Sequence, residues 1–182
     1  MTITLANHLS ASIRLLQKED GYALLAYLQN LSAESKSRFG PHAFDAATVN
    51  SICNDLPGDT HRCIAIDGSS GKIVAYMLLK WGTLEWDRQR YIERGMGFDE
   101  NSTATYAPSV ADEWQSSGLG SAMYAVLESE LKRRHIKTIV LWGGVQATNK
   151  KALGFYIKWG YQVMGSFRHD GKDNHDMIKH LQ

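Results

Sequence analysis

The chain is poor in the residues that build several common kinds of functional site. It has two cysteines, three prolines and a formal net charge of only +1 among 182 residues. Cys53 and Cys63 lack the spacing of metal ligands, so they predict buried thiols in a reduced compartment, a cytoplasmic location and no metal site. The small net charge argues against nucleic-acid binding, which favours an excess of Lys and Arg. No apolar run approaches the roughly 20 residues that cross a bilayer, so no membrane partner is expected.

Two well-known phosphate-binding patterns are also missing. The glycine-rich segment 115–121 contains no lysine and no Gly-Lys-Ser or Gly-Lys-Thr ending, which excludes a P-loop. It also lacks the three spaced glycines of the dinucleotide-binding fingerprint.

What is present is a loop, Val110-Ala-Asp-Glu-Trp-Gln-Ser-Ser-Gly-Leu-Gly-Ser121, followed at once by an amphipathic helix. Gly118 and Gly120 allow backbone angles and close approaches that other residues forbid. The first turn of the helix leaves N–H groups without intrahelical partners and carries partial positive charge. This arrangement is typical of a site for a phosphate group. The helix is predicted from the 3.6-residue spacing of its apolar stripe, Leu119, Ala122, Met123, Val126, Leu127 and Leu131.

The remaining periodicities predict an α/β chain. Strands are expected at residues 12–16, 62–66, 73–79, 103–110, 139–142, 161–167 and 175–181, and helices at residues 21–31, 46–56, within 81–101, and near 149–160. Pro57 and Gly58 are expected to close the second helix. The strand, helix, strand crossover after residue 103 should be parallel and right-handed, so the sheet must be mixed. Residues 1–11 are expected to form a tail or a short strand, and residues 12–182 a single domain.

Two segments of the chain resemble the GNAT superfamily of N-acetyltransferases. Gln115-Ser-Ser-Gly118-Leu-Gly120 is similar to the family's acyl-coenzyme A binding signature. Asn149-Lys-Lys-Ala152-Leu-Gly-Phe155-Tyr156-Ile-Lys-Trp-Gly160-Tyr161 is similar to a second family element. The resemblance implies a mixed, mostly antiparallel central sheet splayed between its fourth and fifth strands, with helices on both faces. It covers nearly the whole chain, from about residue 12 to the end.

The resemblance also implies a binding site for acetyl-coenzyme A as cosubstrate. The main-chain amides of the glycine loop would hold its diphosphate, and serine hydroxyls would add donors. The backbone of Val110 would pair with the pantetheine arm, which Asn149 and Phe155 would also contact. The expected cofactor-binding residues are Val110, Gln115, Ser116, Ser117, Gly118, Leu119, Gly120, Ser121, Asn149 and Phe155.

Some of these residues have a second interpretation. Pro108 marks its strand as incompletely paired, which suits pairing with the pantetheine arm, but a proline can also protect an edge from aggregation. Asn149 is also a common helix cap, and both roles can hold at once.

Tyr156 is the expected catalytic residue, by its match to the tyrosine of the second family element. A phenol with an ordinary pKa near 10 stays protonated at neutral pH and can protonate the departing thiolate. The alternative is that Phe155, Tyr156, Trp159 and Tyr161 form an aromatic core cluster.

The general base is left open. A lysine-like amine is almost fully protonated at neutral pH, so a base or a water chain must help to remove its proton. Glu113, Glu85, Asp99, Glu100 and His42 are conceivable, and each is also explained as a solvated surface group.

Two further segments border the acceptor side in the family. Residues 81–101 stand where a short hairpin is usual, and they could line the acceptor pocket, cover it as a lid, or form a surface excursion or dimer contact. Residues 32–44 contain Arg38, Phe39 and His42, and this basic, aromatic rim suggests a small polar or acidic acceptor.

The sequence therefore predicts an enzyme, an acetyl-coenzyme A dependent N-acetyltransferase acting on a primary amine. A small-molecule acceptor is favoured, protein amines stay open, and the protein is expected to be a monomer or homodimer. The alternative is a non-catalytic module that binds or senses acyl-coenzyme A.

Overall fold

The computed structural model describes residues 1–6, 8–56 and 58–182, which form two compact units. The first unit comprises residues 1–79 and 108–129, and the second comprises residues 80–107 and 130–182. The chain passes from one unit to the other within a strand or a helix. The single domain expected over residues 12–182 stays a prediction. Pro57, expected to help close a helix, lies outside the described residues.

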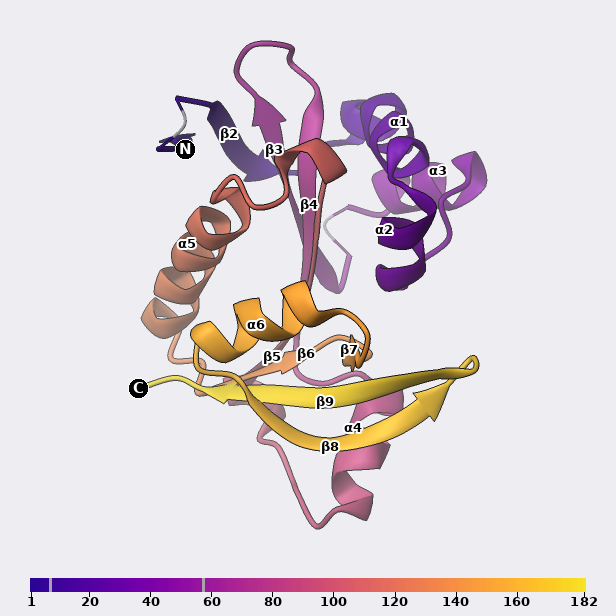
Figure 1. Cartoon of the computed structure of the whole chain (residues 1–182), viewed down its shortest axis with the longest axis vertical. Coiled ribbons are helices and arrows are strands. Elements are labelled where there is room, and N and C mark those ends of the chain that lie inside the picture. Colours follow the sequence, from indigo (N-terminus) through magenta and orange to yellow (C-terminus); the bar gives the residue numbers. More distant parts are fainter. Residues whose placement is uncertain (7, 57) are drawn as a thin grey trace. The chain divides into compact units, whose positions relative to one another are not determined.

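The first unit contains strands in the sheet order β1-β2-β3-β4-β5 (Figure 1). Their bounds are β1 Thr2–Thr4, β2 Ser10–Leu15, β3 Thr60–Asp67, β4 Ile73–Trp81 and β5 Thr103–Val110, of which β4 and β5 continue into the second unit. β2 runs antiparallel to both β1 and β3. The N-terminal residues therefore form the short strand that was one of the two expected possibilities. The expected turn between β3 and β4 is present, with Asp67 N donating to Lys72 O over 2.8 Å.

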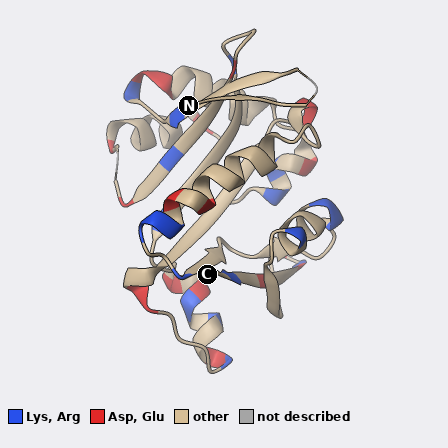
Figure 2. Cartoon of the chain, turned by 90° about the vertical axis from the view of Figure 1, so that its left-hand side faces the viewer, with Lys and Arg blue, Asp and Glu red and all other residues tan. Residues whose placement is uncertain are grey.

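The helices of the first unit bury the predicted apolar stripes. They are the 3₁₀ helix Lys18–Asp20, α1 Gly21–Asn30, α2 Ala33–Arg38, α3 Ala46–Asn54, the 3₁₀ helix Asp112–Trp114 and most of α5 Leu119–Arg133. α1 buries Leu24, Tyr27 and Leu28, and α5 buries the stripe residues Leu119, Met123, Leu127 and Leu131. The charged residues of α5 gather toward its C-terminal end (Figure 2). α2 was not predicted, because none of its residues is buried and it has no apolar stripe.

The second unit is built around the hairpin of β8 and β9. Its further elements are α4 Glu85–Glu93, the 3₁₀ helix Glu100–Ser102, β6 Thr138–Leu141, β7 Val145–Gln146, α6 Lys150–Lys158, β8 Gln162–His169 and β9 Lys172–His180. β9 is antiparallel to β6, β7 and β8, and β5 is parallel to β6, which confirms the predicted parallel crossover. Pairing of β5 with β6 ends at Tyr106 opposite Leu141, whereas β5 continues to Val110. The mixed, mostly antiparallel sheet with helices confirms the predicted fold class.

Two glycines of the second unit occupy backbone conformations that side chains disfavour. Gly160 has a φ of +85° and ends α6, where Tyr161 N donates to Tyr156 O over 2.9 Å and Gly160 N to Ile157 O over 3.0 Å. Asp170 and Gly171, with φ of +46° and +74°, form the two-residue turn that joins β8 to β9. The helix end at Gly160 and the hairpin were expected from the sequence, but the turn is shorter than the expected residues 170–173, because Lys172 and Asp173 already pair with β8. Within the described residues, no helix has the length and hydropathy needed to cross a bilayer.

Candidate functional site

The loop before α5 presents backbone amides that have no hydrogen-bond partner in the described part of the chain. Gly118 O accepts from Ala122 N over 3.0 Å, so α5 begins immediately after Gly118. The amides without a partner are those of Ser116, Gly118, Gly120 and Ser121. Helix starts and turns with free N–H groups bind anions, because those groups and the helix dipole both favour negative charge. The loop therefore offers the donors that a phosphate or diphosphate requires.

Unusual backbone angles shape this loop. Ser116 has a φ of +63° and Gly118 a φ of +95°. The Ser117 hydroxyl donates to Trp114 O over 2.6 Å and accepts from Leu119 N over 3.2 Å. Two of the predicted binding residues thus have structural roles. The Ser117 hydroxyl stabilises the turn through its hydrogen bonds, and the side chain of Leu119 is fully buried and packs α5 into the core.

Gln115 connects the loop to the end of β5. Its side-chain nitrogen donates to Val110 O over 3.3 Å and to the Ser35 hydroxyl over 3.2 Å. Pro108 lies in the part of β5 that continues beyond the last residue pair with β6. The loop and the predicted pantetheine strand are therefore joined directly by a predicted binding residue.

Asp112, which precedes the glycine loop, connects this region to α2 through hydrogen bonds. Its carboxylate accepts from Ser32 N over 2.8 Å, the Ser32 hydroxyl over 2.8 Å and the Ser35 hydroxyl over 2.6 Å. Burial would raise the pKa of Asp112, but the hydrogen bonds from Ser35 and Ser32 outweigh it and hold the pKa below its ordinary value. This contact could not be predicted from the sequence, because its partners are about 80 residues apart and α2 itself was not predicted.

Replacing Asp112 with alanine should destabilise the protein by about 1 kcal/mol at neutral pH, because three hydrogen bonds to an exposed carboxylate are lost. The folded pKa is lowered, so this stabilisation is present above the ordinary pKa of 3.8 and is lost as the pH falls through the folded value. Urea unfolding of the wild type and Asp112→Ala should therefore differ at pH 7 and converge in acid. Glu113→Gln, a neighbouring exposed carboxylate, is the control and should behave like the wild type. Equal stability of Asp112→Ala and the wild type at pH 7 would contradict this role.

The second unit holds the other predicted site residues on α6. Asn149 caps the helix, with its side-chain oxygen accepting from Ala152 N over 3.1 Å, which confirms the capping interpretation. Phe155 is partly buried, and Tyr156 is buried with 6% of its surface exposed. The structure thus carries the loop residues in the first unit and Asn149, Phe155 and Tyr156 in the second.

Tyr156 lies among aromatic rings. Its ring centroid is 5.3 Å from that of Phe155 and 5.1 Å from that of Tyr161, both in edge-on geometry, and Phe155 is 6.3 Å from Trp159. The predicted aromatic cluster therefore exists. This packing holds the ring of Tyr156 in place. A substitution that removes only the hydroxyl group therefore tests its role as an acid without disturbing the packing.

The five conceivable general bases differ in their surroundings. Glu85 pairs with Arg88, Asp99 caps the 3₁₀ helix Glu100–Ser102, and Glu100 accepts from Thr83 N over 2.6 Å. The hydroxyl of Ser102 and the amide of Asn101 hold the pKa of Asp99 below its ordinary value. Glu113 is exposed. The imidazole of His42 is different, because its Nε2 is buried and has no hydrogen-bond partner within the described residues.

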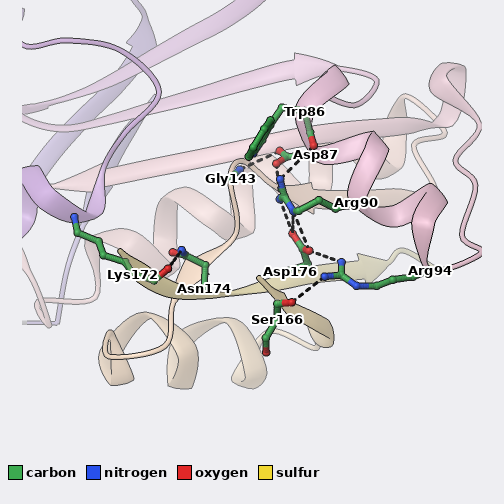
Figure 3. Close-up of polar contacts among 9 residues, drawn as sticks. All are labelled: Trp86, Asp87, Arg90, Arg94, Gly143, Ser166, Lys172, Asn174 and Asp176. Atoms are coloured by element: carbon green, nitrogen blue, oxygen red, sulfur yellow. Dashed lines mark hydrogen bonds and ion pairs between the residues drawn. The ribbon is translucent and has the colours of Figure 1, made fainter. Parts of the chain in front are cut away.

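Residues 85–93 of the segment 81–101 form α4, which is held to β9 by buried charges (Figure 3). Asp176 is fully buried and accepts from Arg90 over 2.6 Å and Arg94 over 2.5 Å. Arg90 also pairs with the fully buried Asp87 over 2.7 Å, and its guanidinium lies 3.7 Å from the centroid of Phe167. These contacts hold α4 against the β8–β9 hairpin.

A glycine makes room for one of these arginines. A Cβ on Gly165 of β8 would lie 2.6 Å from Arg94 Nε, so no other residue fits without displacing that side chain. Among the described residues, no group of three or more His, Cys, Asp or Glu side chains could hold a metal ion. Cys53 and Cys63 are free thiols, the first buried and the second partly buried.

Comparison with known proteins gives a consistent result. The model of the Acetyltransferase (GNAT) family matches residues 25–161. The crystal structure of the GNAT domain of S. lividans PAT has a TM-score of 0.75 and 21% identity, covering 100% of this chain and 96% of that one. The ribosomal-protein-S5-alanine acetyltransferase of Vibrio fischeri has a TM-score of 0.72 and 13% identity, covering 93% and 92%. The ribosomal-protein-S18-alanine N-acetyltransferase of Escherichia coli has a TM-score of 0.61 and 21% identity, covering 93% of each. A search of curated protein sequences gave no match.

Proposed function

Because the chain belongs to the GNAT acetyltransferase family, we propose that it is an N-acetyltransferase that moves an acetyl group from acetyl-coenzyme A to a primary amine. In this proposal the acceptor is a small molecule, and the protein works in the cytoplasm as a monomer or homodimer.

The observation that carries this proposal is the set of amides at the start of α5, those of Ser116, Gly118, Gly120 and Ser121, which have no partner among the described residues. A coenzyme diphosphate needs several fixed donors, and a helix N-terminus supplies them together with favourable charge. Gln115 holds the loop against Val110, whose strand would pair with the pantetheine arm. Asn149 uses its side-chain oxygen as a cap, which leaves its amide nitrogen as a donor for the same arm. Phe155 would pack against that arm.

Tyr156 has the role of general acid in this proposal. The coenzyme supplies an acetyl thioester. The amine nitrogen of the acceptor attacks the carbonyl carbon of this thioester, and the carbon–sulfur bond breaks. The phenol of Tyr156 gives its proton to the departing thiolate. The resulting phenolate regains a proton from solvent, because a phenol with an ordinary pKa near 10 is a weaker acid than a thiol with an ordinary pKa of about 8.5. The proton lost by the amine goes to a base or to solvent.

The proposal is tested by measuring binding and chemistry separately. Calorimetric titration with acetyl-coenzyme A should show saturable uptake, and a panel of amines should include at least one that releases free thiol. Uptake without thiol release from any amine would favour the alternative of a sensing module. Absence of uptake would refute both.

Replacing Gly118 with alanine should weaken acetyl-coenzyme A binding about tenfold. The φ of +95° disfavours a side chain, and relaxation of that strain would turn the loop amides away from the diphosphate. A Cβ there would meet no atom within 4 Å, so no steric clash is involved.

Gly71 provides a matched control for this substitution. It has a φ of +68° and the same open surroundings, but lies in the turn between β3 and β4. Gly71→Ala should lose similar stability and keep its affinity for acetyl-coenzyme A. Equal affinity of Gly118→Ala and Gly71→Ala would count against the loop as the diphosphate site.

A further inference from the structure

The last residues of β5 have a neighbouring strand on one edge only. Pairing of β5 with β6 ends at Tyr106 opposite Leu141, whereas β5 continues to Val110. On its other edge β5 stays beside β4, where Ala111 N donates to Val74 O over 2.9 Å. A segment held by one neighbouring strand has fewer fixed backbone bonds than one held by two, so its position depends more on its side chains.

The hydrogen bonds of β5 determine which of its backbone groups face the open edge. Gly82 N donates to Thr103 O over 2.8 Å, and Ala111 bonds to β4 beyond the other end of the strand. Alternate residues of an antiparallel pair bond to the partner strand, so the odd-numbered residues of β5 face β4. Tyr106 faces the opposite way, because its carbonyl oxygen accepts from Trp142 N, just after β6, over 2.9 Å.

Pro108 and Val110 therefore direct their backbone groups toward the open edge. Proline has no N–H, so the edge offers the carbonyl oxygen of Pro108 as an acceptor and the N–H of Val110 as a donor. The carbonyl oxygen of Val110 already accepts from the Gln115 side chain over 3.3 Å. One acceptor and one donor are what a secondary amide requires, and the pantetheine arm contains such amides.

A buried hydrogen bond anchors the residue between these two groups. The hydroxyl of Ser109 lies 2.8 Å from the hydroxyl of Tyr27 on α1. Tyr27 has 5% and Ser109 has 8% of its surface exposed. Burial raises the pKa of Tyr27, so its phenol stays protonated at neutral pH. The bond therefore links α1 to the part of β5 that lacks a second neighbouring strand.

We propose that Tyr27 is a positioning residue for the acetyl donor. Its hydrogen bond to Ser109 holds the carbonyl oxygen of Pro108 and the N–H of Val110 in the geometry that the pantetheine arm requires. A segment already fixed in this geometry loses little conformational freedom when the arm binds, so the arm binds more tightly. This inference rests on the proposed acetyltransferase function and adds to it a residue that acts through Ser109.

The test compares acetyl-coenzyme A with a nucleotide that lacks the arm. Adenosine 3′-phosphate 5′-diphosphate keeps the diphosphate, so calorimetry with both ligands isolates the contribution of the arm. The wild type should bind acetyl-coenzyme A about 100-fold more tightly than the nucleotide, because hydrogen bonds and packing along the arm add to the diphosphate contacts. Tyr27→Phe should lower this affinity ratio about tenfold and leave the affinity for the nucleotide unchanged.

A double substitution separates positioning from stability. Tyr27→Phe and Ser109→Ala each leave one buried hydroxyl without its partner, so each should destabilise the protein in urea unfolding. The double variant removes both hydroxyls and should regain most of the lost stability. It should keep the lowered affinity ratio, because the bond between α1 and β5 is still absent.

Thr105→Val is the matched control on the same strand. Thr105 is fully buried, and its hydroxyl donates to Gly82 O over 2.8 Å. It lies where β5 has both β4 and β6 as neighbours. The control should lose stability, because a buried hydrogen bond is removed, and should keep the wild-type affinity ratio.

The outcomes distinguish this inference from the function on which it rests. A wild-type affinity ratio in Tyr27→Phe, or a restored ratio in the double variant, would overturn the inference, while uptake of acetyl-coenzyme A would keep the proposed function. An equally lowered ratio in Thr105→Val would also overturn it, since any loss of stability would then have the same effect. No uptake of either ligand by the wild type would refute the function and the inference together.

Discussion

Replacing Tyr156 with phenylalanine should lower kcat about 100-fold or more and leave the affinity for acetyl-coenzyme A nearly unchanged, since a positioned general acid contributes about 10²–10⁴-fold. Phenylalanine keeps the ring that packs against Phe155 and Tyr161 at centroid distances of 5.3 Å and 5.1 Å. The variant therefore removes the proton donor and preserves the packing. The measurements are steady-state kinetics with the best amine acceptor and calorimetry with acetyl-coenzyme A.

Tyr161 is the matched control for this experiment. It belongs to the same aromatic cluster, has 3% of its surface exposed, and lies just beyond the C-terminal end of α6. Tyr161→Phe should keep kcat within about twofold, because it removes no catalytic proton donor. If Tyr156→Phe keeps the wild-type kcat as well, Tyr156 serves only the aromatic cluster and the acid must be sought elsewhere.

Replacing Asp176 with alanine should destabilise the protein by about 3–5 kcal/mol, the usual effect of removing one member of a buried ion pair. Asp176 is fully buried and accepts from both Arg90 and Arg94. Its loss leaves two partly buried guanidinium groups with fewer partners, and Asp87 becomes the remaining carboxylate beside Arg90. Denaturant unfolding measures the change, and α4 should lose protection from amide hydrogen exchange first.

Asp173 on the same strand supplies the comparison. It pairs with Arg168 over 2.9 Å, but both side chains are 67% exposed. Asp173→Ala should have little measurable effect on stability, since exposed ion pairs contribute little. Similar stability of Asp176→Ala and Asp173→Ala would show that the buried network does not hold α4 to β9.

The elements with strong local signals were predictable from the sequence. β5 has the predicted bounds of residues 103–110, α5 buries four of its six predicted stripe residues, and Gly160 ends α6 as expected. In each case the signal is local in the sequence. It is either the periodic spacing of apolar residues or a glycine at the end of a helix.

Elements without such signals were missed. α2 buries none of its residues, and β7 is only 2 residues long. The Asp87–Arg90–Asp176–Arg94 network joins residues that are more than 80 positions apart, such as Arg90 and Asp176. Such contacts depend on the tertiary fold, and a charged residue by itself gives no indication of its partner.

The candidate site was predictable in type but not in detail. The spacing of Gln115, Gly118 and Gly120 indicated a loop that binds an anion, whereas the internal use of the Ser117 hydroxyl depends on the loop's own conformation. His42 appeared in the sequence as one of several conceivable bases. Only the structure distinguishes it, through a buried Nε2 that has no hydrogen-bond partner among the described residues.

The most direct test of the central claim is a two-dimensional amide NMR titration of the isotopically labelled protein with acetyl-coenzyme A. Binding of the diphosphate by the loop should shift the amide signals of Ser116, Gly118, Gly120 and Ser121 strongly. Adenosine 3′-phosphate 5′-diphosphate, which keeps the diphosphate and lacks the thioester arm, should shift the same signals. Binding of acetyl-coenzyme A that leaves these four signals in place would contradict the claim.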